Sequence, residues 1–309
     1  MTHSARTVRP TDLVALVSYD GRVYANEAMT RDRIGTQASP HPLETAFEQW
    51  FSFATGRHTW ISVKGATLRG LVSARKRGSK LAWEVDCLIN ATDDDGVLMS
   101  LLDQLTEAAG RSGALRVFAR VPCQSEVERA AARCGFAPYL REQTYRRFVN
   151  RGESYGAAEG LRRRTKADQY AAFQLYNEVV PADVRRMEAM TFVEWTAAQE
   201  SLGRTSAYVL EREGKVAGAL RIAGDGEIGR FDVLGRLDTL DDLIEAGMAK
   251  VANRSSMYTL VAEHQEGVAR RLAAAGFEAA EEYVVLSRKT VHPVKVRRIV
   301  PALVRPTLG

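Results

Sequence analysis

The sequence predicts an α/β (α+β) protein built as two tandem units, each a mixed, mostly antiparallel sheet flanked by helices. One observation is a repeat: Gln124–Phe148 and Gln265–Lys289 each read as an amphipathic helix, a Gly-Phe pair and a strand. Their glycines, Gly135 and Gly276, lie 141 residues apart. Glycine favours the left-handed conformation that ends a helix, because it has no Cβ. Two such endings at one spacing indicate a duplicated domain.

The second observation is the order of the elements, which is the same in both halves. Each half reads as two helices, three strands, a helix, a strand, a helix and a strand. For residues 1–150 we expect the following elements: helices from Thr11 and over Leu43–Phe53, strands over Thr59–Val63, Leu68–Ala74, Leu81–Ile89 and Leu115–Val121, and a helix over Gly96–Ala109. Between the first two helices, Arg22–Pro42 is predicted to be a loop that could serve as a lid.

Residues 151–160 are rich in glycine and polar residues and are the expected linker. Residues 161–290 form the second predicted unit, with these elements before the repeated stretch: helices from Thr165 and over Phe192–Leu202, strands over Ser206–Arg212, Val216–Ile222, Glu227–Val233 and Tyr258–Ala262, and a helix over Leu240–Ala252. Residues 291–309 are an expected basic, extended tail. We expect two matching sheets lying side by side. A single continuous sheet would contradict this expectation and the functional interpretation that depends on it.

Composition limits the class of protein. The 309 residues suffice for two domains, and 45% hydrophobic with 26% charged residues is typical of a soluble globular protein. No apolar run is long enough to cross a bilayer, and the N-terminus has no signal-peptide core, so we expect a cytoplasmic protein without a membrane partner. Three scattered cysteines and five scattered histidines argue against disulfides and a metal site. The net charge of +5 permits an anionic ligand.

This order of elements, closed by helix, Gly-Phe and strand, resembles the GNAT (Gcn5-related N-acetyltransferase) superfamily, twice over nearly the whole chain. The resemblance implies an acyl-CoA-dependent N-acyltransferase, such as an N-acetyltransferase, with at most one half active. Its cofactor would be acetyl-CoA or another acyl-CoA, without a metal, and its acceptor a small-molecule or peptide amine. A homodimer is compatible with the sequence, and no nucleic-acid partner is expected.

The resemblance also implies where the cofactor binds. In the family it lies between the fourth and fifth strands, with its pyrophosphate on the helix N-terminus that follows the fourth strand. The residues at these positions and at the start of the repeated stretch are Leu88, Asn90, Gly96, Val97 and Gln124 in the first half and Leu234 and Arg236 in the second. A backbone N–H near Leu88–Asn90 would hold the oxyanion.

The pyrophosphate loop of the family, Arg/Gln-x-x-Gly-x-Gly/Ala, is degenerate in both halves. Its three defined positions are occupied by Asp93, Gly96 and Leu98 in the first half and by Gly235, Asp238 and Leu240 in the second. Because the first half keeps the middle glycine, we expect that half to hold the cofactor. Asp93–Asp95 are interpreted as a helix N-cap cluster rather than a cation site.

Acidic residues on the fourth strand are the candidate general bases, as in many members of the family: Glu84 and Asp86 in the first half and Asp232 in the second. The alternative is that these carboxylates pair with neighbouring arginines. The tyrosine that protonates the departing thiolate in many members is replaced by Ala131 and Leu272. The sequence therefore leaves a second function open, a catalytically inactive tandem GNAT protein that serves as a ligand-binding or scaffold module.

Overall fold

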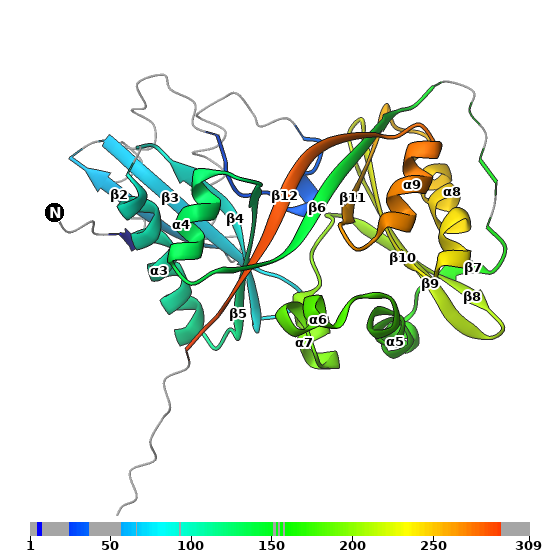
Figure 1. The fold of residues 1–309 in the computed structure, drawn as a ribbon, viewed down its shortest axis with the longest axis horizontal. Coiled ribbons are helices and arrows are strands. Elements are labelled where there is room, and N and C mark those ends of the chain that lie inside the picture. Colours follow the sequence, from blue (N-terminus) through cyan, green and yellow to red (C-terminus); the bar gives the residue numbers. More distant parts are fainter. Residues whose placement is uncertain are drawn as a thin grey trace, which may run out of the picture.

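Figure 1 shows the computed structural model of the chain. The structure describes residues 5–7, 25–36, 57–65, 67–92, 94–150, 153, 155–156 and 158–291. The helices predicted from Thr11 and over Leu43–Phe53, Asp93 of the loop, and all but the first residue of the predicted tail lie outside the described residues.

Twelve strands form one sheet in the order β1-β2-β3-β4-β5-β12-β6-β11-β10-β9-β8-β7. The strands of the first half are β1 (Arg6–Thr7), β2 (His58–Lys64), β3 (Thr67–Lys76), β4 (Ala82–Asn90), β5 (Arg116–Pro122) and β6 (Ala137–Phe148). Those of the second half are β7 (Leu161–Arg163), β8 (Thr205–Arg212), β9 (Lys215–Asp225), β10 (Ile228–Gly235), β11 (Ser256–Ala262) and β12 (Glu278–Lys289). Neighbours pair antiparallel, except β4 with β5 and β10 with β11.

The two halves exchange their last strands at the centre of this sheet. β12 of the second half pairs with β5 of the first, and β6 of the first half pairs with β11 of the second. β6 and β12 also pair with each other, and both run through the middle of Figure 1. Each of these strands is 12 residues long, which gives it the length to serve both halves.

The predicted fold class is therefore confirmed, but the two separate sheets are not. The predicted strands and helices that fall within the described residues occur in the predicted order, but β1, β7 and the helix over Ala182–Glu188 were not predicted. Parallel pairs are limited to β4–β5 and β10–β11. The sheets are continuous because each half takes the last strand of the other half as a neighbour of its fifth strand. Duplication is retained, since the exchange treats the two halves alike.

Helices cover the sheet in three groups (Figure 1). The first half carries α3 (Asp95–Arg111) and α4 (Glu126–Arg133), and the second carries α8 (Leu240–Val251) and α9 (Glu266–Ala274). The third group is α5 (Gln169–Val179), α6 (Ala182–Glu188) and α7 (Phe192–Ala198). This group packs on both halves, since its core joins Trp195 and Phe173 to Phe118 and Leu140 of β5 and β6. None of the described helices combines the length and hydrophobicity needed to span a bilayer.

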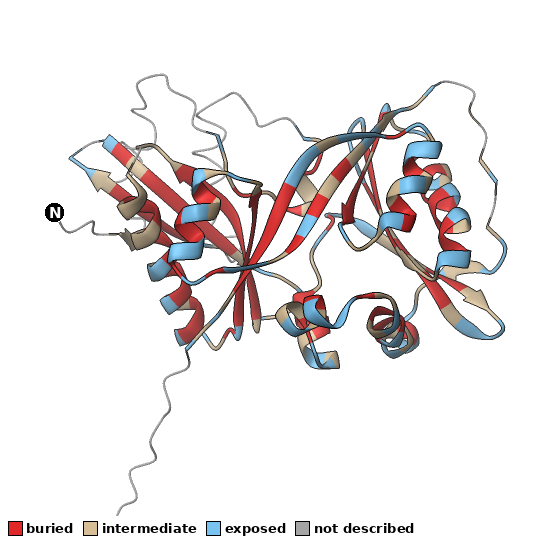
Figure 2. Ribbon diagram, in the orientation of Figure 1, coloured by how far each residue is buried: buried red, intermediate tan, exposed pale blue. Residues whose placement is uncertain are grey.

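The repeated stretches end their helices as predicted. Gly135 and Gly276 have φ angles of 79° and 80°, in the left-handed region where a side chain would be strained. Phe136 and Phe277, which follow them, are buried in the cores of the two halves. Figure 2 shows the same pattern over the whole molecule, with buried residues along the strands and on the inner sides of the helices.

Residues 25–36, which fall within the predicted loop, form a buried connection between the halves. They include the short 3-10 helix η2 (Arg31–Arg33), and Ala28, Thr30 and Ile34 are each 5% exposed or less. Ile34 packs with Leu260 of β11, so this part of the segment is fixed against the second half. It is therefore part of the core, and the potential lid is not supported for these residues.

Candidate functional site

Two slots open in the sheet where its parallel strand pairs stop pairing. β4 pairs with β5 only up to Glu84 and Phe118, although both strands continue. β10 likewise pairs with β11 only up to Arg230 and Tyr258. We name the opening between β4 and β5 the first slot and the opening between β10 and β11 the second slot. Backbone groups that face a slot need other hydrogen-bond partners.

Residues 26–29 of the chain itself fill the first slot. The Glu27 N–H donates to the Leu88 carbonyl of β4 at 2.8 Å, and the Met29 N–H donates to the Arg120 carbonyl of β5 at 2.9 Å. The Asn26 side chain completes this arrangement, because its Oδ1 accepts from the Leu88 N–H at 2.9 Å. The Leu88 backbone, which was expected to face the cofactor, is therefore fully engaged by an internal segment.

The second slot contains a side chain in place of a main-chain segment. Gln265 Oε1 accepts from the Ala262 N–H at 3.1 Å, and its Nε2 donates to the Val233 carbonyl at 3.3 Å. The N–H and C=O groups of one strand residue point to the same side. The Val233 N–H therefore also faces this slot, where the described part of the chain adds no further strand.

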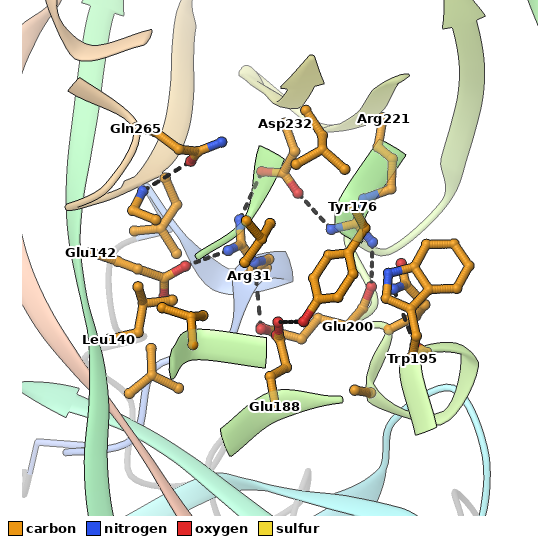
Figure 3. Close-up of a pocket in the computed structure, with 18 of the residues that line it drawn as sticks. Arg31, Leu140, Glu142, Tyr176, Glu188, Trp195, Glu200, Arg221, Asp232 and Gln265 are labelled. Atoms are coloured by element: carbon orange, nitrogen blue, oxygen red, sulfur yellow. Dashed lines mark hydrogen bonds and ion pairs between the residues drawn. The ribbon is translucent and has the colours of Figure 1, made fainter. Parts of the chain in front are cut away.

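A cavity of about 170 Å³ adjoins the second slot. Its wall includes Val233 and Leu234 of β10 and Ala262 of β11, and Figure 3 shows it in close-up. The remaining lining comes from the α5–α7 group and from strands of both halves, including Tyr139, Leu140, Glu142, Tyr176, Val180, Val184, Glu188, Trp195, Arg221 and His264. The exchanged strand β6 thus supplies part of the wall of a cavity that belongs to the second half.

An ion-pair network borders this cavity. Arg31 of η2 pairs with Asp232 at 3.0 Å, with Glu200 at 3.5 Å and with Glu142 (Figure 3). Arg120 of β5 pairs with Glu142 at 2.7 Å and with Glu200 at 2.8 Å, and Arg120 and Glu142 are 2% and 1% exposed. Side chains of both halves and of residues 25–36 thus neutralise one another at the exchange point.

The predicted general bases are all paired with arginines, as the alternative interpretation proposed. Glu84 accepts from Arg75 at 2.7 Å, and Asp86 pairs with Arg57 at 2.7 Å; both carboxylates are buried and neither lines the cavity. Burial raises the pKa of Glu84 even though arginines surround it.

Asp232 does line the cavity, but Arg31 and Arg221 hold it at 3.0 and 2.6 Å. Each of its two oxygens accepts a hydrogen bond from a guanidinium group, so neither oxygen is left without a cation to receive an acceptor amine. We therefore assign it no role as a base.

Glu188, at the end of α6, is a cavity residue that the sequence did not indicate. The Tyr176 hydroxyl donates to its carboxylate at 2.9 Å, and no basic side chain of the described residues forms an ion pair with it. Burial, the largest effect, raises the pKa of Glu188. We predicted no helix here; Pro181 followed by an acidic first turn was a usable signal for its start.

His264, beside Gln265, is a second such residue. It lines the cavity, and its Nδ1 has no hydrogen-bond partner among the described residues. Burial lowers the pKa of the imidazole, which favours its neutral form. A neutral ring can accept a proton or a hydrogen bond from a ligand.

Comparison with solved structures identifies the fold. A GCN5-related N-acetyltransferase from Sphaerobacter thermophilus superposes with a TM-score of 0.55 at 14% identity, covering 94% of this chain and 97% of that protein. The chain has the GNAT fold. A putative acetyltransferase from Pyrococcus horikoshii gives a TM-score of 0.53 at 11% identity, covering 93% and 89% of the two chains. Saccharomyces cerevisiae N-myristoyltransferase with bound myristoyl-CoA gives a TM-score of 0.50 at 14% identity, covering 95% of this chain and 80% of that protein. No protein-family model and no curated protein matches the sequence.

In the first GNAT unit the expected phosphate-binding groups already have partners. Asp94 caps α3: its Oδ1 accepts from the Gly96 N–H at 2.9 Å, and its carbonyl accepts from the Val97 N–H at 3.0 Å. The N-cap interpretation is thus confirmed for Asp94. Asn90 Oδ1 accepts from the Thr92 N–H at 3.3 Å, and Gln124 is exposed at the surface.

In the second GNAT unit, arginines border the corresponding loop, which includes η5 (Leu237–Thr239). Arg236 pairs with Glu178 through two bonds of 2.7 and 2.9 Å. Arg271 of α9 donates to Asp241 at 2.9 Å and to the Leu237 carbonyl at 3.2 Å. Both pairs are at the surface, so these cations remain accessible to a ligand. The described residues contain no cluster of potential metal ligands.

Proposed function

We propose that the chain is an acyl-CoA-dependent N-acyltransferase whose reaction centre lies in the second unit. One observation carries this proposal: the second slot opens onto a cavity, whereas residues 26–29 fill the first slot. The unit that keeps Gly96 is thus the less suitable one, which reverses the expectation from the sequence. At most one unit would be active, as the sequence suggested.

The first slot indicates what the second can bind. Asn26 and Glu27 show that an extended, amide-containing chain bridges such a slot through the backbone of its fourth strand. The pantetheine arm of coenzyme A is an extended chain with two amides. Val233 offers it a backbone N–H, and the Val233 carbonyl, which accepts from Gln265 at 3.3 Å, would exchange this partner for an amide of the cofactor. The residues of the second slot therefore fit this cofactor.

The phosphates of the cofactor would lie at the loop after β10. Arg236 and Arg271 are the cations at this loop. The exposed Arg236–Glu178 pair stabilises the chain by at most about 1 kcal/mol, so a phosphate can replace Glu178 at little cost. Asp238 and Asp241 in the same region oppose the phosphates, which predicts modest affinity.

The bound cofactor would supply an activated acyl group as a thioester, either acetyl or a longer acyl group. Glu188 would take the proton from the acceptor amine, since it lines the cavity and forms no ion pair among the described residues. The amine would form the amide bond as the thioester bond breaks, and coenzyme A would leave as a thiolate that takes its proton from solvent. The Val233 N–H, facing the second slot, is the group placed to stabilise the oxyanion. Arg31 holds Asp232 and Glu142 in place around this centre.

The experiment is a titration of the intact chain with acetyl-CoA, followed by a transfer assay against a panel of amines that detects released thiol. One binding site per chain and transfer to at least one amine would support the proposal. Absence of binding at millimolar acetyl-CoA would overturn it.

A catalytically inactive binding module is the second candidate. It is favoured by Leu272, which leaves no tyrosine to protonate the departing thiolate, and by the acidic loop of the second unit. This candidate predicts that acetyl-CoA binds but that no amine in the panel is acylated. Transfer to any amine would exclude it.

A further inference from the structure

Arg164 is a cation in the cavity wall without an anionic partner. It follows β7, is half-buried and lines the cavity, yet it forms no ion pair within the described part of the chain. Asp168, the nearby acid, is already held by Arg162 at 2.8 and 2.7 Å and by the Thr165 N–H at 2.7 Å. Arg164 therefore lines the cavity without an ion-pair partner among the described residues, and Asp168 acts on it only as a weaker, more distant charge.

Arg221 lies close enough to Arg164 to act on it electrostatically. Burial and, secondarily, the charge of Arg221 lower the pKa of Arg164. Arg221 itself is satisfied, because it donates to Asp232 at 2.6 Å and to the Glu200 carbonyl at 2.7 Å. A half-buried cation that is repelled by a neighbour and lacks an anion is a site where a ligand anion is stabilised.

Glu188 also lines the cavity and comes from a different element. It ends α6, which packs on β6, whereas Arg164 follows β7 at the edge of the sheet.

The part of the cavity wall that α5–α7 contribute is mostly apolar. It contains Ala172, Val180, Val184, Trp195 and Ala198. A cavity of comparable size in another protein holds a benzene molecule. Its volume of about 170 Å³ therefore has room for a short hydrocarbon chain.

We propose that the acceptor is an ω-amino carboxylate: Glu188 receives its amine, Arg164 its carboxylate, and the apolar wall its methylene chain. This inference rests on the proposed function, because it assigns the acceptor of that reaction centre. A carboxylate held by an arginine forms charge-assisted hydrogen bonds, which makes the cavity selective against plain amines.

The test measures binding by calorimetry without any acyl-CoA, so that its outcome is independent of the acyl donor. The probes are aminocaproate, hexylamine, caproate and norleucine, which is the α-amino isomer of aminocaproate. Shorter ω-amino acids, γ-aminobutyrate and δ-aminovalerate, define the preferred length. Aminocaproate or one of these two should bind at least about tenfold more tightly than hexylamine, caproate and norleucine, as expected for hydrogen bonds to charged groups.

Arg164→Met should remove the advantage of the ω-amino acid over hexylamine and leave hexylamine binding unchanged, which also shows that the variant is folded. Arg164→Lys should keep part of the advantage. Arg163→Met, a change at the exposed neighbour, is the matched control and should bind like the wild type. Equal binding of the ω-amino acid and hexylamine, tighter binding of norleucine, or no binding of any ω-amino acid at millimolar concentration would overturn the proposal. Acetyl-CoA binding is measured separately. If it is retained while no ω-amino acid binds, the acceptor assignment is wrong but the proposed acyltransferase function is not.

Discussion

The hydroxyl group of Tyr176 donates a hydrogen bond of 2.9 Å to the carboxylate of Glu188. The two residues come from α5 and α6, and both line the cavity beside the second slot. This bond fixes the direction of a carboxylate that has no arginine partner among the described residues. It distinguishes Glu188 from Asp232, whose carboxylate is paired with the guanidinium groups of Arg31 and Arg221.

Replacement of Glu188 tests its role in proton transfer. Glu188→Gln keeps the shape of the side chain but removes its capacity to take a proton. We expect kcat to fall about 10²- to 10⁴-fold, with little change in the Kd of acetyl-CoA. Glu107→Gln, which changes an exposed acid of α3 far from the cavity, is the control and should retain full activity. Full activity of the Glu188 variant would contradict the assignment.

Glu188→Gln should also change how the stability of the fold depends on pH. Because burial raises the pKa of Glu188 above 4.5, its ordinary value, the folded state loses stability as the pH rises through the folded-state pKa. Below the ordinary value the carboxyl group is protonated in both states. We therefore expect Glu188→Gln to have a higher Tm than the wild type at pH 8 and the same Tm at acidic pH. Thermal unfolding across this range measures the difference, and a lower Tm for the variant at pH 8 would contradict it.

The paired glutamines provide a test of which slot binds the cofactor. Gln265 hydrogen-bonds within the second slot, whereas Gln124, at the equivalent place in the first unit, is exposed. Loss of a side-chain hydrogen bond that orders the slot costs about 1 kcal/mol, so Gln265→Ala should weaken acetyl-CoA binding by about fivefold. Gln124→Ala should have no effect, and calorimetric titration of both variants measures this. Weaker acetyl-CoA binding by Gln124→Ala, with no change for Gln265→Ala, would instead indicate that the cofactor binds in the first unit.

The ion pairs at the strand exchange should stabilise the whole fold. Arg120→Met leaves Glu142 and Glu200 without one of their cations in the interior, and such a loss costs about 3–5 kcal/mol. Arg111→Met removes an exposed pair with Glu107 and should change stability by no more than about 0.5 kcal/mol. Urea unfolding gives both free energies. Equal effects of the two changes would show that the buried network contributes little.

Local features of the fold could be predicted from the sequence. The stops at Gly135 and Gly276 depend on residues next to one another in the chain, and both glycines have the predicted left-handed conformation. The exchange of β6 and β12 could not be predicted, because alternation of residues along a strand says which face is buried and not which strand lies beside it.

The site was predicted less well for a related reason. Asn26 and Leu88 are 62 positions apart in the sequence, and Arg31 and Asp232 are 201 apart. No local sequence pattern predicts either contact. Glu188 lies on a helix of seven residues, too short to show a clear apolar period. The alternative that the acids on β4 pair with arginines is confirmed, but the half-exposed face expected for them is wrong, because Glu84 and Asp86 are buried. Their partners, Arg75 of β3 and Arg57 before β2, could not be identified from the sequence of β4 alone.

The most direct test of the central claim is a crystal structure of the chain with acetyl-CoA. The account predicts that the pantetheine arm lies between β10 and β11 against Val233, with Asn26 and Glu27 still in place between β4 and β5. An acetyl-CoA molecule between β4 and β5 that displaces Asn26 from Leu88 would contradict it.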